Sequence, residues 1–487
     1  MGFQVESSYF RDGIAYRNYS GLPMKYARQL AQALLLSTIC FDLVAAEQPV
    51  AAVENLANSA TLDTTNKTTA TAEPIVDQRW GIHGQMTSFT QTYAAFNSPY
   101  SGTNSLPGYS DSAATFDADL FIGIKLWTGA EAYFNPEINQ GFGLAGTLGI
   151  AGFPSGAAYK VGSAEPYYRT TRAFIRQSFN LGGDSITLED QPNQLAKKMT
   201  SNNIVITAGK FAVVDIFDTN TYAHDPRLDF ANWVGVEAGA FDYAADAWGY
   251  TYGAAIEWNQ DWWSLRGGFF DLSVVPNSTQ IDIGFKQYQL VTEFEERHEL
   301  WGKKGKFKVL GFVNRANMGR YSDAVTLAQQ TGSSPDTGLV RQMAWRPGVA
   351  INFEQEITPT LGVFLRASQN SGAHEAYEFT DINQSVSGGL SIKGNSWGRP
   401  NDTLGLAGIV NGISKDAQQY FANGGLGILV GDGALNYGPE QILEAYYSFA
   451  ATDFLTFSID YQHITNPGYN RDRGPVNIFG FRARAYF

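Results

Sequence analysis

Six polar side chains fall close together after the apolar stretch that contains Phe211. They are Asp215, Asp218, Asn220, His224, Asp225 and Arg227. Carboxylates grouped with a histidine could bind a metal ion or serve as an acid and base pair. The spacing is not that of an EF-hand calcium loop, however, and Asp and Asn also cap tight turns. We therefore favour a structural role, in which Arg227 pairs with a carboxylate and pins a folded loop.

The histidines do not indicate an enzyme. The chain has five of them, and none lies in an H-E-x-x-H motif. His298 follows Glu295, Glu296 and Arg297 in a charged segment that we expect to end a strand. The sequence therefore predicts no catalytic residues and no metal site.

The elements that carry these side chains are predicted to be β-strands. From Trp80 to the C-terminus, segments of about ten residues alternate apolar with polar side chains and are separated by Gly, Asn, Asp and Pro. In one segment Ile351 and Phe353 face one side while Asn352 and Glu354 face the other. Strands of a water-soluble sandwich alternate in the same way, so this pattern alone leaves the membrane assignment open.

The C-terminal segment favours a membrane barrel. Phe479 and Phe481 share one face, Arg482 and Arg484 take the other, and the chain stops at Phe487. A soluble protein has no need of an exposed terminal aromatic side chain. The segment resembles the final strand that the barrel-assembly machinery recognises in outer-membrane barrels. We expect Phe487 to be part of that recognition signal.

The number of candidate strands indicates a large barrel. Counting from Trp80 gives about sixteen, of which the stretch near Trp233 is the weakest, and a closed antiparallel barrel favours an even number. A barrel of that size encloses water, whereas one of about eight strands is filled by side chains. We therefore predict an all-β fold, a transmembrane antiparallel β-barrel of about sixteen strands over residues 79–487.

The N-terminal residues include a predicted export signal. Residues 24–46 place Lys25 and Arg28 before a short apolar stretch and small residues, which is the plan of a secretory signal peptide. Residues 1–23 precede it and suggest an upstream or mis-assigned start. Residues 47–78, rich in Ala, Thr and Asn, predict a flexible periplasmic lead.

Charge and cysteine content exclude other classes. The formal net charge is −13, which repels a nucleic-acid backbone, so we expect no nucleic-acid partner. The single cysteine, Cys40, falls in the segment expected to be removed, so a disulfide scaffold is excluded. Beyond the N-terminus no run of 18 apolar residues could form a membrane-spanning helix.

Three long stretches resemble one known family. They are GKFAVVDIFDTNTYAHDPRLDFANW from Gly209, FDYAADAWGYTYGAAIEWN from Phe241 and DYQHITNPGYNRDRGP from Asp460. In these stretches the chain resembles the carbohydrate-selective porins, the family of the glucose-inducible outer-membrane porin of pseudomonads. The resemblance extends from about Trp80 to Phe487. It implies a Gram-negative outer-membrane barrel whose long extracellular loops fold inward, and through which mono- and small oligosaccharides diffuse passively. It implies no catalysis, metal or cofactor.

A sugar is neutral and covered in hydroxyls, so a sugar path needs planar donors and carboxylate acceptors. It also needs an aromatic face, which packs against the apolar C–H surface of the sugar ring. Strand alternation places a set of charged residues toward the lumen, where charge costs less than in lipid. These lumen candidates are Lys125, Glu131, Arg172, Arg176, Arg266, Glu354, Arg366 and Glu444. The six residues from Asp215 to Arg227 are the constriction-loop candidates. For any single one of these charges, wetting a water-filled wall is an equally simple role.

Two alternatives stay open at this point. A general or cation-preferring porin would suit the acidic balance of the chain. A surface adhesin or structural barrel would share the same strand pattern. The expected partners are small sugars, outer-membrane lipids and the barrel-assembly machinery, and we favour a monomer.

Overall fold

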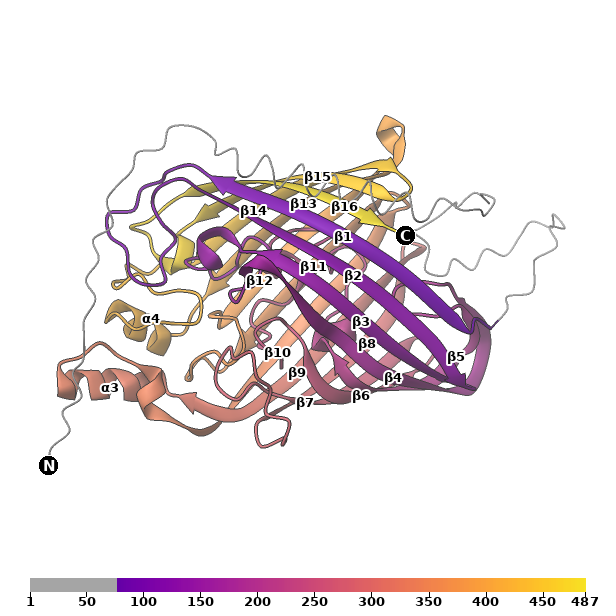
Figure 1. Ribbon diagram of the computed structural model, residues 1–487, viewed down its shortest axis with the longest axis horizontal. Coiled ribbons are helices and arrows are strands. Elements are labelled where there is room, and N and C mark those ends of the chain that lie inside the picture. Colours follow the sequence, from indigo (N-terminus) through magenta and orange to yellow (C-terminus); the bar gives the residue numbers. More distant parts are fainter. Residues whose placement is uncertain (1–76) are drawn as a thin grey trace, which may run out of the picture. The chain divides into compact units, whose positions relative to one another are not determined.

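Sixteen antiparallel strands close into one barrel in the computed structural model, which describes residues 77–487 (Figure 1). The predicted upstream segment 1–23, the signal peptide 24–46 and all but the last two residues of the lead 47–78 lie outside the described residues. The strands are β1 Trp80–Tyr93, β2 Asp111–Trp127, β3 Ala130–Gly141, β4 Ser163–Leu188, β5 Lys197–Phe211, β6 Thr251–Asn259, β7 Trp263–Asp271, β8 Tyr288–Leu300, β9 Lys303–Gly319, β10 Arg341–Thr358, β11 Leu361–Asn370, β12 Gln384–Gly394, β13 Arg399–Gly412, β14 Glu440–Thr452, β15 Leu455–Thr465 and β16 Val476–Tyr486. The predicted antiparallel barrel of about sixteen strands is confirmed.

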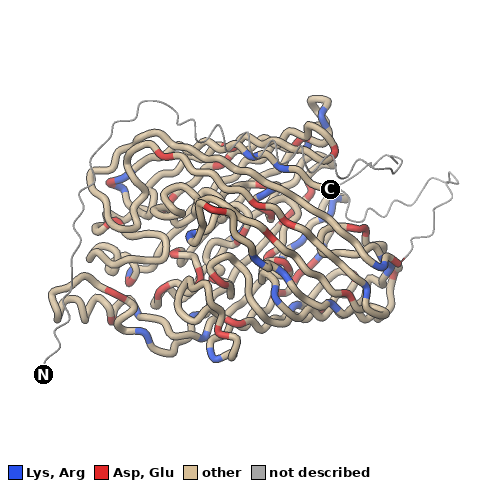
Figure 2. Tube along the Cα trace, viewed as in Figure 1, with Lys and Arg blue, Asp and Glu red and all other residues tan. Residues whose placement is uncertain are grey.

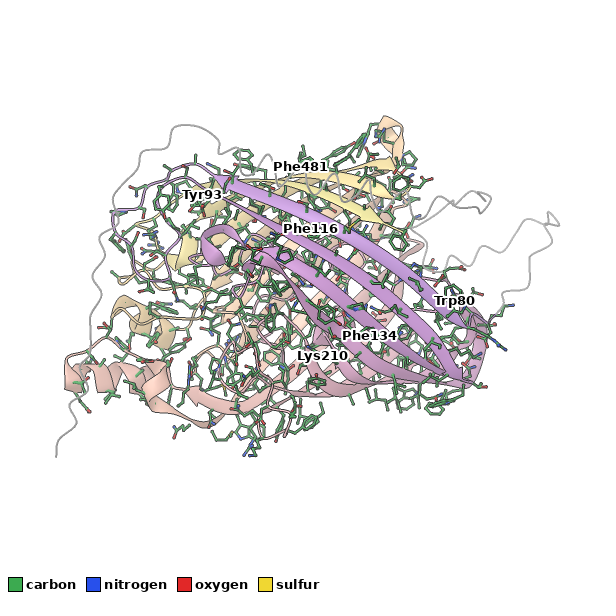
Figure 3. The ribbon with its side chains drawn as sticks, in the orientation of Figure 1. Trp80, Tyr93, Phe116, Phe134, Lys210 and Phe481 are labelled. Atoms are coloured by element: carbon green, nitrogen blue, oxygen red, sulfur yellow. The ribbon has the colours of Figure 1, made fainter. Side chains whose placement is uncertain are left out.

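Alternation along each strand separates the two faces of the wall. Leu365 is 47% exposed while its neighbour Arg366 is 1% exposed, and Phe481 at 50% adjoins Arg482 at 3%. Phe481 is one of several apolar side chains on the outer face of the wall (Figure 3). Polar side chains therefore point into the barrel and apolar ones into lipid, as a membrane barrel requires.

The two ends of the barrel differ in the length of their connections. At one end the strands are joined by short turns, such as residues 359–360 between β10 and β11. At the other end the connections are 94–110, 142–162, 212–250, 272–287, 320–340, 371–383, 413–439 and 466–475. Long connections mark the extracellular end of outer-membrane barrels and short turns the periplasmic end.

Three α-helices lie among the long connections. They are α2 Trp233–Val236, α3 Tyr321–Thr331 and α4 Lys415–Ala422. Within residues 77–487 no helix has the length and hydropathy needed to cross a membrane.

The barrel closes where the first strand meets the last. Residues 85–93 of β1 pair with residues 478–486 of β16. Beyond the ladder, the backbones of Gly84 and Phe487 exchange two N–H to O=C hydrogen bonds, each of 3.0 Å. A Cβ on Gly84 would lie 2.4 Å from the Phe487 ring, so a larger residue at this position would require the exposed C-terminal ring to move.

The longest connection, residues 212–250, folds into the barrel interior. Its apolar residues pack against inward-facing rings of the wall, with Phe230 5.0 Å from Tyr446 and Phe241 5.0 Å from Phe312 between ring centroids. The stretch near Trp233, counted as the weakest candidate strand, is instead the helix α2, which the Asn232 side chain caps at the Val234 N–H at 3.1 Å. That part of the strand prediction was wrong. The stretch is apolar because it is buried inside the barrel, whereas a strand of the wall would be buried on one face only.

Charged residues are distributed along the strands and loops, with Lys and Arg interspersed among Asp and Glu (Figure 2). Most of the strand carboxylates are buried within the barrel and face a cation or a backbone N–H. An acidic chain therefore does not present a uniformly acidic lumen.

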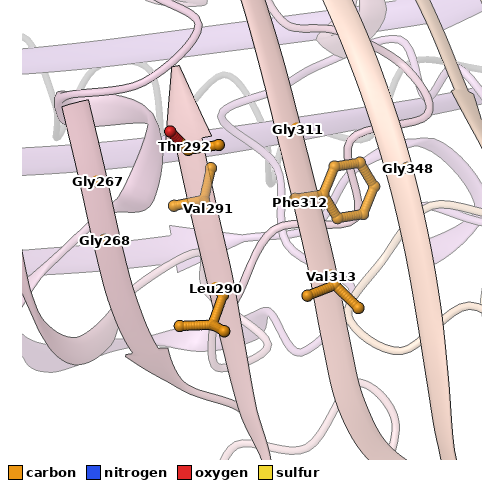
Figure 4. A pocket seen from close by; sticks show the side chains of 9 residues that line it. All are labelled: Gly267, Gly268, Leu290, Val291, Thr292, Gly311, Phe312, Val313 and Gly348. Atoms are coloured by element: carbon orange, nitrogen blue, oxygen red, sulfur yellow. The ribbon is translucent and has the colours of Figure 1, made fainter. Parts of the chain in front are cut away.

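Glycines leave one region of the wall, across β7 to β10, with few side chains. Gly267 and Gly311 flank Thr292 on the outward face, where Leu290 and Phe294 are also exposed. Gly267, Leu290, Thr292 and Gly311 are among the residues that line a depression of about 540 Å³ (Figure 4). None of the predicted lumen or constriction-loop residues lines it, so we assign it no part in the candidate sugar path.

Candidate pore constriction

Arg266 is the most heavily paired of the strand arginines predicted to face the lumen. Its guanidinium lies 3.1 Å from Glu257, 2.7 Å from Glu293 and 3.0 Å from Glu295. Lys308 on β9 adds a further contact to Glu295 at 3.4 Å. This buried network joins β6 to β9 and leaves Arg266 only 8% exposed.

Arg172 on β4 is different because its partner comes from the inward loop. Its Nε and Nη2 donate to the two carboxylate oxygens of Asp215 at 2.7 and 2.6 Å. The guanidinium also lies 5.1 Å from the centre of the Tyr250 ring. Both partners of the pair keep side-chain exposure, 18% for Arg172 and 28% for Asp215.

Three of the predicted residues lie toward the periplasmic ends of β2, β3 and β4. Glu131 is buried, pairs with Lys197 at 2.8 Å and accepts a hydrogen bond from Tyr133 at 2.9 Å. Arg176 donates to the carbonyl of Asn193 at 2.8 Å. Lys125 pairs with Asp77. These three side chains brace the short-turn end, away from the Arg172–Asp215 pair.

The other three predicted lumen residues hold the inward loop against the far wall. The Glu354 carboxylate on β10 accepts from the Thr221 N–H and hydroxyl, both at 2.7 Å. Arg366 on β11 donates to the Asp218 carboxylate at 3.1 Å and to the Ala223 carbonyl at 2.8 Å.

The Glu444 carboxylate on β14 accepts from the backbone N–H groups of Ala231 and Asn232, at 2.5 and 3.2 Å. Together with Glu354 and Arg366 it fixes the loop from 218 to 232 to three strands.

Within the loop, Asp218 is the central anchor. Its carboxylate accepts from Arg366, from the Asn352 amide at 2.7 Å and from the Ala238 N–H at 2.7 Å. Its own N–H donates to Glu293 at 2.7 Å. Asp218 adopts a φ of 55°, in the left-handed region that Asp and Asn tolerate better than most residues.

At the other end of the loop, Arg227 lies against the opposite wall. Arg227 donates to Asp117 of β2 at 2.6 Å and lies 3.8 Å from Asp119. The Asp225 carboxylate accepts from the Arg227 N–H at 2.8 Å. Desolvation pulls against the charged form of Asp225, but the Arg227 guanidinium holds the pKa of that carboxyl below its ordinary value. Burial lowers the pKa of His224, which favours the neutral imidazole.

Asn220 donates to the Asn352 side chain at 2.8 Å on the far wall. The loop thus spans the interior, since Asn220 lies against β10 while Arg227 reaches β2. Among residues 77–487 no group of His, Cys, Asp and Glu is arranged to hold a metal ion.

Five residues of this region were not singled out from the sequence. Arg169 of β4 donates to Glu137 of β3 at 2.8 Å, and its guanidinium lies among three rings, 4.7 Å from Tyr159, 5.2 Å from Trp248 and 5.5 Å from Tyr250. Strict alternation places Arg169, three residues before Arg172, on the opposite face of the strand, and only the bulge between their pairings with Asn135 and Glu137 returns it to the lumen face. The three rings come from two different loops, and no local pattern predicts that they meet.

One short motif matches a hydrolase signature by its letters alone. Gly394 to Gly398 reads G-x-S-x-G around Ser396. The stretch forms the short turn between β12 and β13, with a single 3-10 turn at Asn395–Trp397. A nucleophile elbow requires a strand that leads into an α-helix, so this serine does not have the geometry of one.

A closed sixteen-stranded barrel with an apolar outer face, a polar interior and a loop folded across it defines the class of outer-membrane porins. A family model described as "Carbohydrate-selective porin, OprB family" matches residues 108–487. The chain therefore belongs to the OprB family of carbohydrate-selective porins, a family of non-enzymatic outer-membrane channels of Gram-negative bacteria.

Solved structures agree with the fold. OprB of Pseudomonas putida superposes with a TM-score of 0.64 at 15% sequence identity, covering 85% of this chain and 95% of that one. The outer-membrane channel DcaP of Acinetobacter baumannii gives a TM-score of 0.47 at 10% identity, covering 84% and 97%. Comparison with curated protein sequences yields no match. The resemblance inferred from the sequence is confirmed.

Proposed function

We propose that mono- and small oligosaccharides diffuse passively through this barrel and are selected where the inward loop faces β2, β3 and β4. The observation that carries the proposal is the Arg172–Asp215 pair, which joins wall to loop, keeps exposure to the lumen and lies beside the Tyr250 ring. A guanidinium and a carboxylate offer paired donors and acceptors to sugar hydroxyls, and a ring offers an apolar face to the sugar C–H groups.

The charges at this site nearly cancel. Three arginines, Arg169, Arg172 and Arg227, face four carboxylates on β2, β3 and the loop, which are Asp117, Asp119, Glu137 and Asp215. The formal charge of the set is 3 − 4 = −1, so its net attraction to an ion is small, while every member can still exchange hydrogen bonds with a neutral polyol. This near-cancellation favours a sugar path over the cation-preferring porin that the net charge of the chain would suggest.

Liposome swelling tests the proposal. The refolded protein is reconstituted into liposomes, and swelling rates are compared in isosmotic glucose, disaccharide, amino-acid and salt solutions. We expect glucose to enter faster than amino acids of similar size. Rates that follow solute size alone would indicate a general porin, and rates highest for cations would indicate a cation-preferring one. No swelling in any solute would favour an adhesin or a structural barrel.

A further inference from the structure

A second polar cavity lies at the extracellular end, apart from the constriction. It has a volume of about 380 Å³ and is lined by residues of the connections 142–162, 272–287, 320–340, 371–383 and 413–439, together with the first residue of β10. The helices α3 and α4 belong to two of these connections (Figure 1). Small-molecule sites have volumes of about 300 to 1,000 Å³, so this vestibule pocket could enclose one or two sugar rings.

The walls of the vestibule pocket are fixed by hydrogen bonds between loops. Lys160 donates to the carbonyl of Ile428 at 2.6 Å. Arg341 donates to both carboxylate oxygens of Glu375 at 2.8 and 3.0 Å, and the Thr337 hydroxyl donates to the same carboxylate at 2.8 Å. A pocket whose walls are already ordered loses little conformational entropy when a ligand binds.

One wall atom has an unused hydrogen-bonding capacity. Asp381 is only 4% exposed, and its Oδ2 accepts from the Leu429 and Val430 N–H groups at 2.7 and 3.2 Å. Its Oδ1 has no hydrogen-bond partner among residues 77–487. A Cβ at Gly427 would lie 2.5 Å from Oδ2 and 2.7 Å from Oδ1, so only a glycine fits against this carboxylate. A buried acceptor without a donor is unfavourable, and a hydrogen bond from a ligand hydroxyl would relieve that cost.

The charges around the pocket indicate what kind of ligand fits. Lys160 and Arg341 oppose a cation, whereas Asp336, Glu375 and Asp381 oppose an anion. A neutral molecule that both donates and accepts meets neither repulsion. Leu426 and the Tyr321 ring supply an apolar surface for C–H groups.

We infer that the vestibule pocket is a separate capture site for neutral hexoses, which binds a sugar before it reaches the constriction. This inference rests on the proposed sugar passage. In it, Asp381 Oδ1 accepts from a sugar hydroxyl, while Lys160 and Asp336 bind further hydroxyls at the mouth.

Single-channel recording in planar bilayers tests the inference, with D-glucose as the probe. In channels inserted from one side, glucose interrupts the ion current, and its association rate is measured from each side in turn. Asp381→Asn keeps one carbonyl oxygen for the Leu429 and Val430 N–H groups but can place an N–H donor where Oδ1 stood. Losing one hydrogen bond should lower association from the long-loop side by about three- to tenfold. Lys160→Met should act in the same direction.

Matched controls separate this site from the constriction. Lys415→Met removes a similar exposed cation from α4, outside the pocket, and should leave association unchanged. Association from the periplasmic side and the glucose-free conductance should stay at wild-type values in every variant. If Asp381→Asn and Lys160→Met bind glucose at the wild-type rate from the long-loop side, the capture site is refuted while sugar passage stands. If wild-type protein neither binds nor passes glucose, both proposals fail.

Discussion

The arginines predicted to face the lumen are of two kinds, which differ in their contacts. Arg266 is held by three carboxylates within the wall, so its replacement would leave buried charges unpaired and perturb the barrel itself. Arg172 contacts one partly exposed carboxylate of the loop and keeps access to water. Sequence alternation places both on the same face of the wall, and the structure distinguishes them by their contacts. We propose that Arg172 is the one that exchanges its partner for a sugar.

Arg172→Lys should therefore weaken sugar selection without unfolding the barrel. A lysine keeps the charge but loses the planar fork that bonds Asp215 through two N–H groups. We expect glucose permeation relative to salt to fall about three- to tenfold in liposome swelling. Arg315→Lys is the matched control, because Arg315 packs on the rings of Tyr288 and Trp345. An equal loss in both variants would contradict the role given to Arg172.

Glu237 should make the inward loop sensitive to pH. Burial raises the pKa of this loop carboxyl to about 8, and the Trp233 indole donates to it at 2.6 Å. An unfolded glutamate titrates near 4.3, so between about pH 4.3 and 8 the folded loop binds the extra proton and its stability falls as pH rises. Hydrogen-exchange protection of residues 233–243 should be lower at pH 9 than at pH 6. Glu237→Gln should remove most of this difference, and a pH response unchanged by the substitution would refute the assignment.

At the scale of elements, the inward loop depends on a small number of buried anchors. Arg366→Met would leave the Asp218 carboxylate without its cation, and breaking a buried pair in this way costs about 3 to 5 kcal/mol. We expect lower exchange protection over residues 218–241, a higher single-channel conductance and a loss of preference for glucose over amino acids.

Arg399→Met serves as the control for this anchor. It removes the partly exposed Arg399 partner of the buried Asp402 at the short-turn end, where the Tyr447 hydroxyl and the Ala450 N–H still donate to that carboxylate. Conductance that stays at the wild-type value in Arg366→Met would show that the loop does not limit the pore.

The strands could be predicted from the sequence, whereas the loops could not. Period-two alternation is a local property, so Leu365 and Arg366 are assigned to opposite faces without any tertiary contact. The loop residues lack such a period. Tyr159, Trp248 and Arg169 meet only because two connections fold over β4. Asp432 contacts Ser105, Asn470 and Arg473 from other segments. Long-range packing of this kind leaves no mark on neighbouring residues.

At the scale of the whole molecule, the last residue completes the closed sheet. Phe487 joins Gly84 by two backbone hydrogen bonds, and these do not depend on its side chain. The Phe487 ring itself is 73% exposed and contributes little to the packed interior. We propose that its identity serves recognition during assembly and not the stability of the finished barrel.

Phe487→Ala should therefore separate assembly from folding. Because the backbone hydrogen bonds to Gly84 remain, we expect the variant to refold in detergent with wild-type thermal stability and glucose permeation. In cells, its amount in the outer membrane should fall, because the assembly machinery would lose the terminal aromatic ring. Phe479→Ala removes another exposed ring from the same strand, eight residues before the end, and should assemble normally. Equal outer-membrane levels of the two variants would mean that Phe487 is not the feature recognised, and a refolding defect confined to Phe487→Ala would assign the ring to closure of the barrel instead.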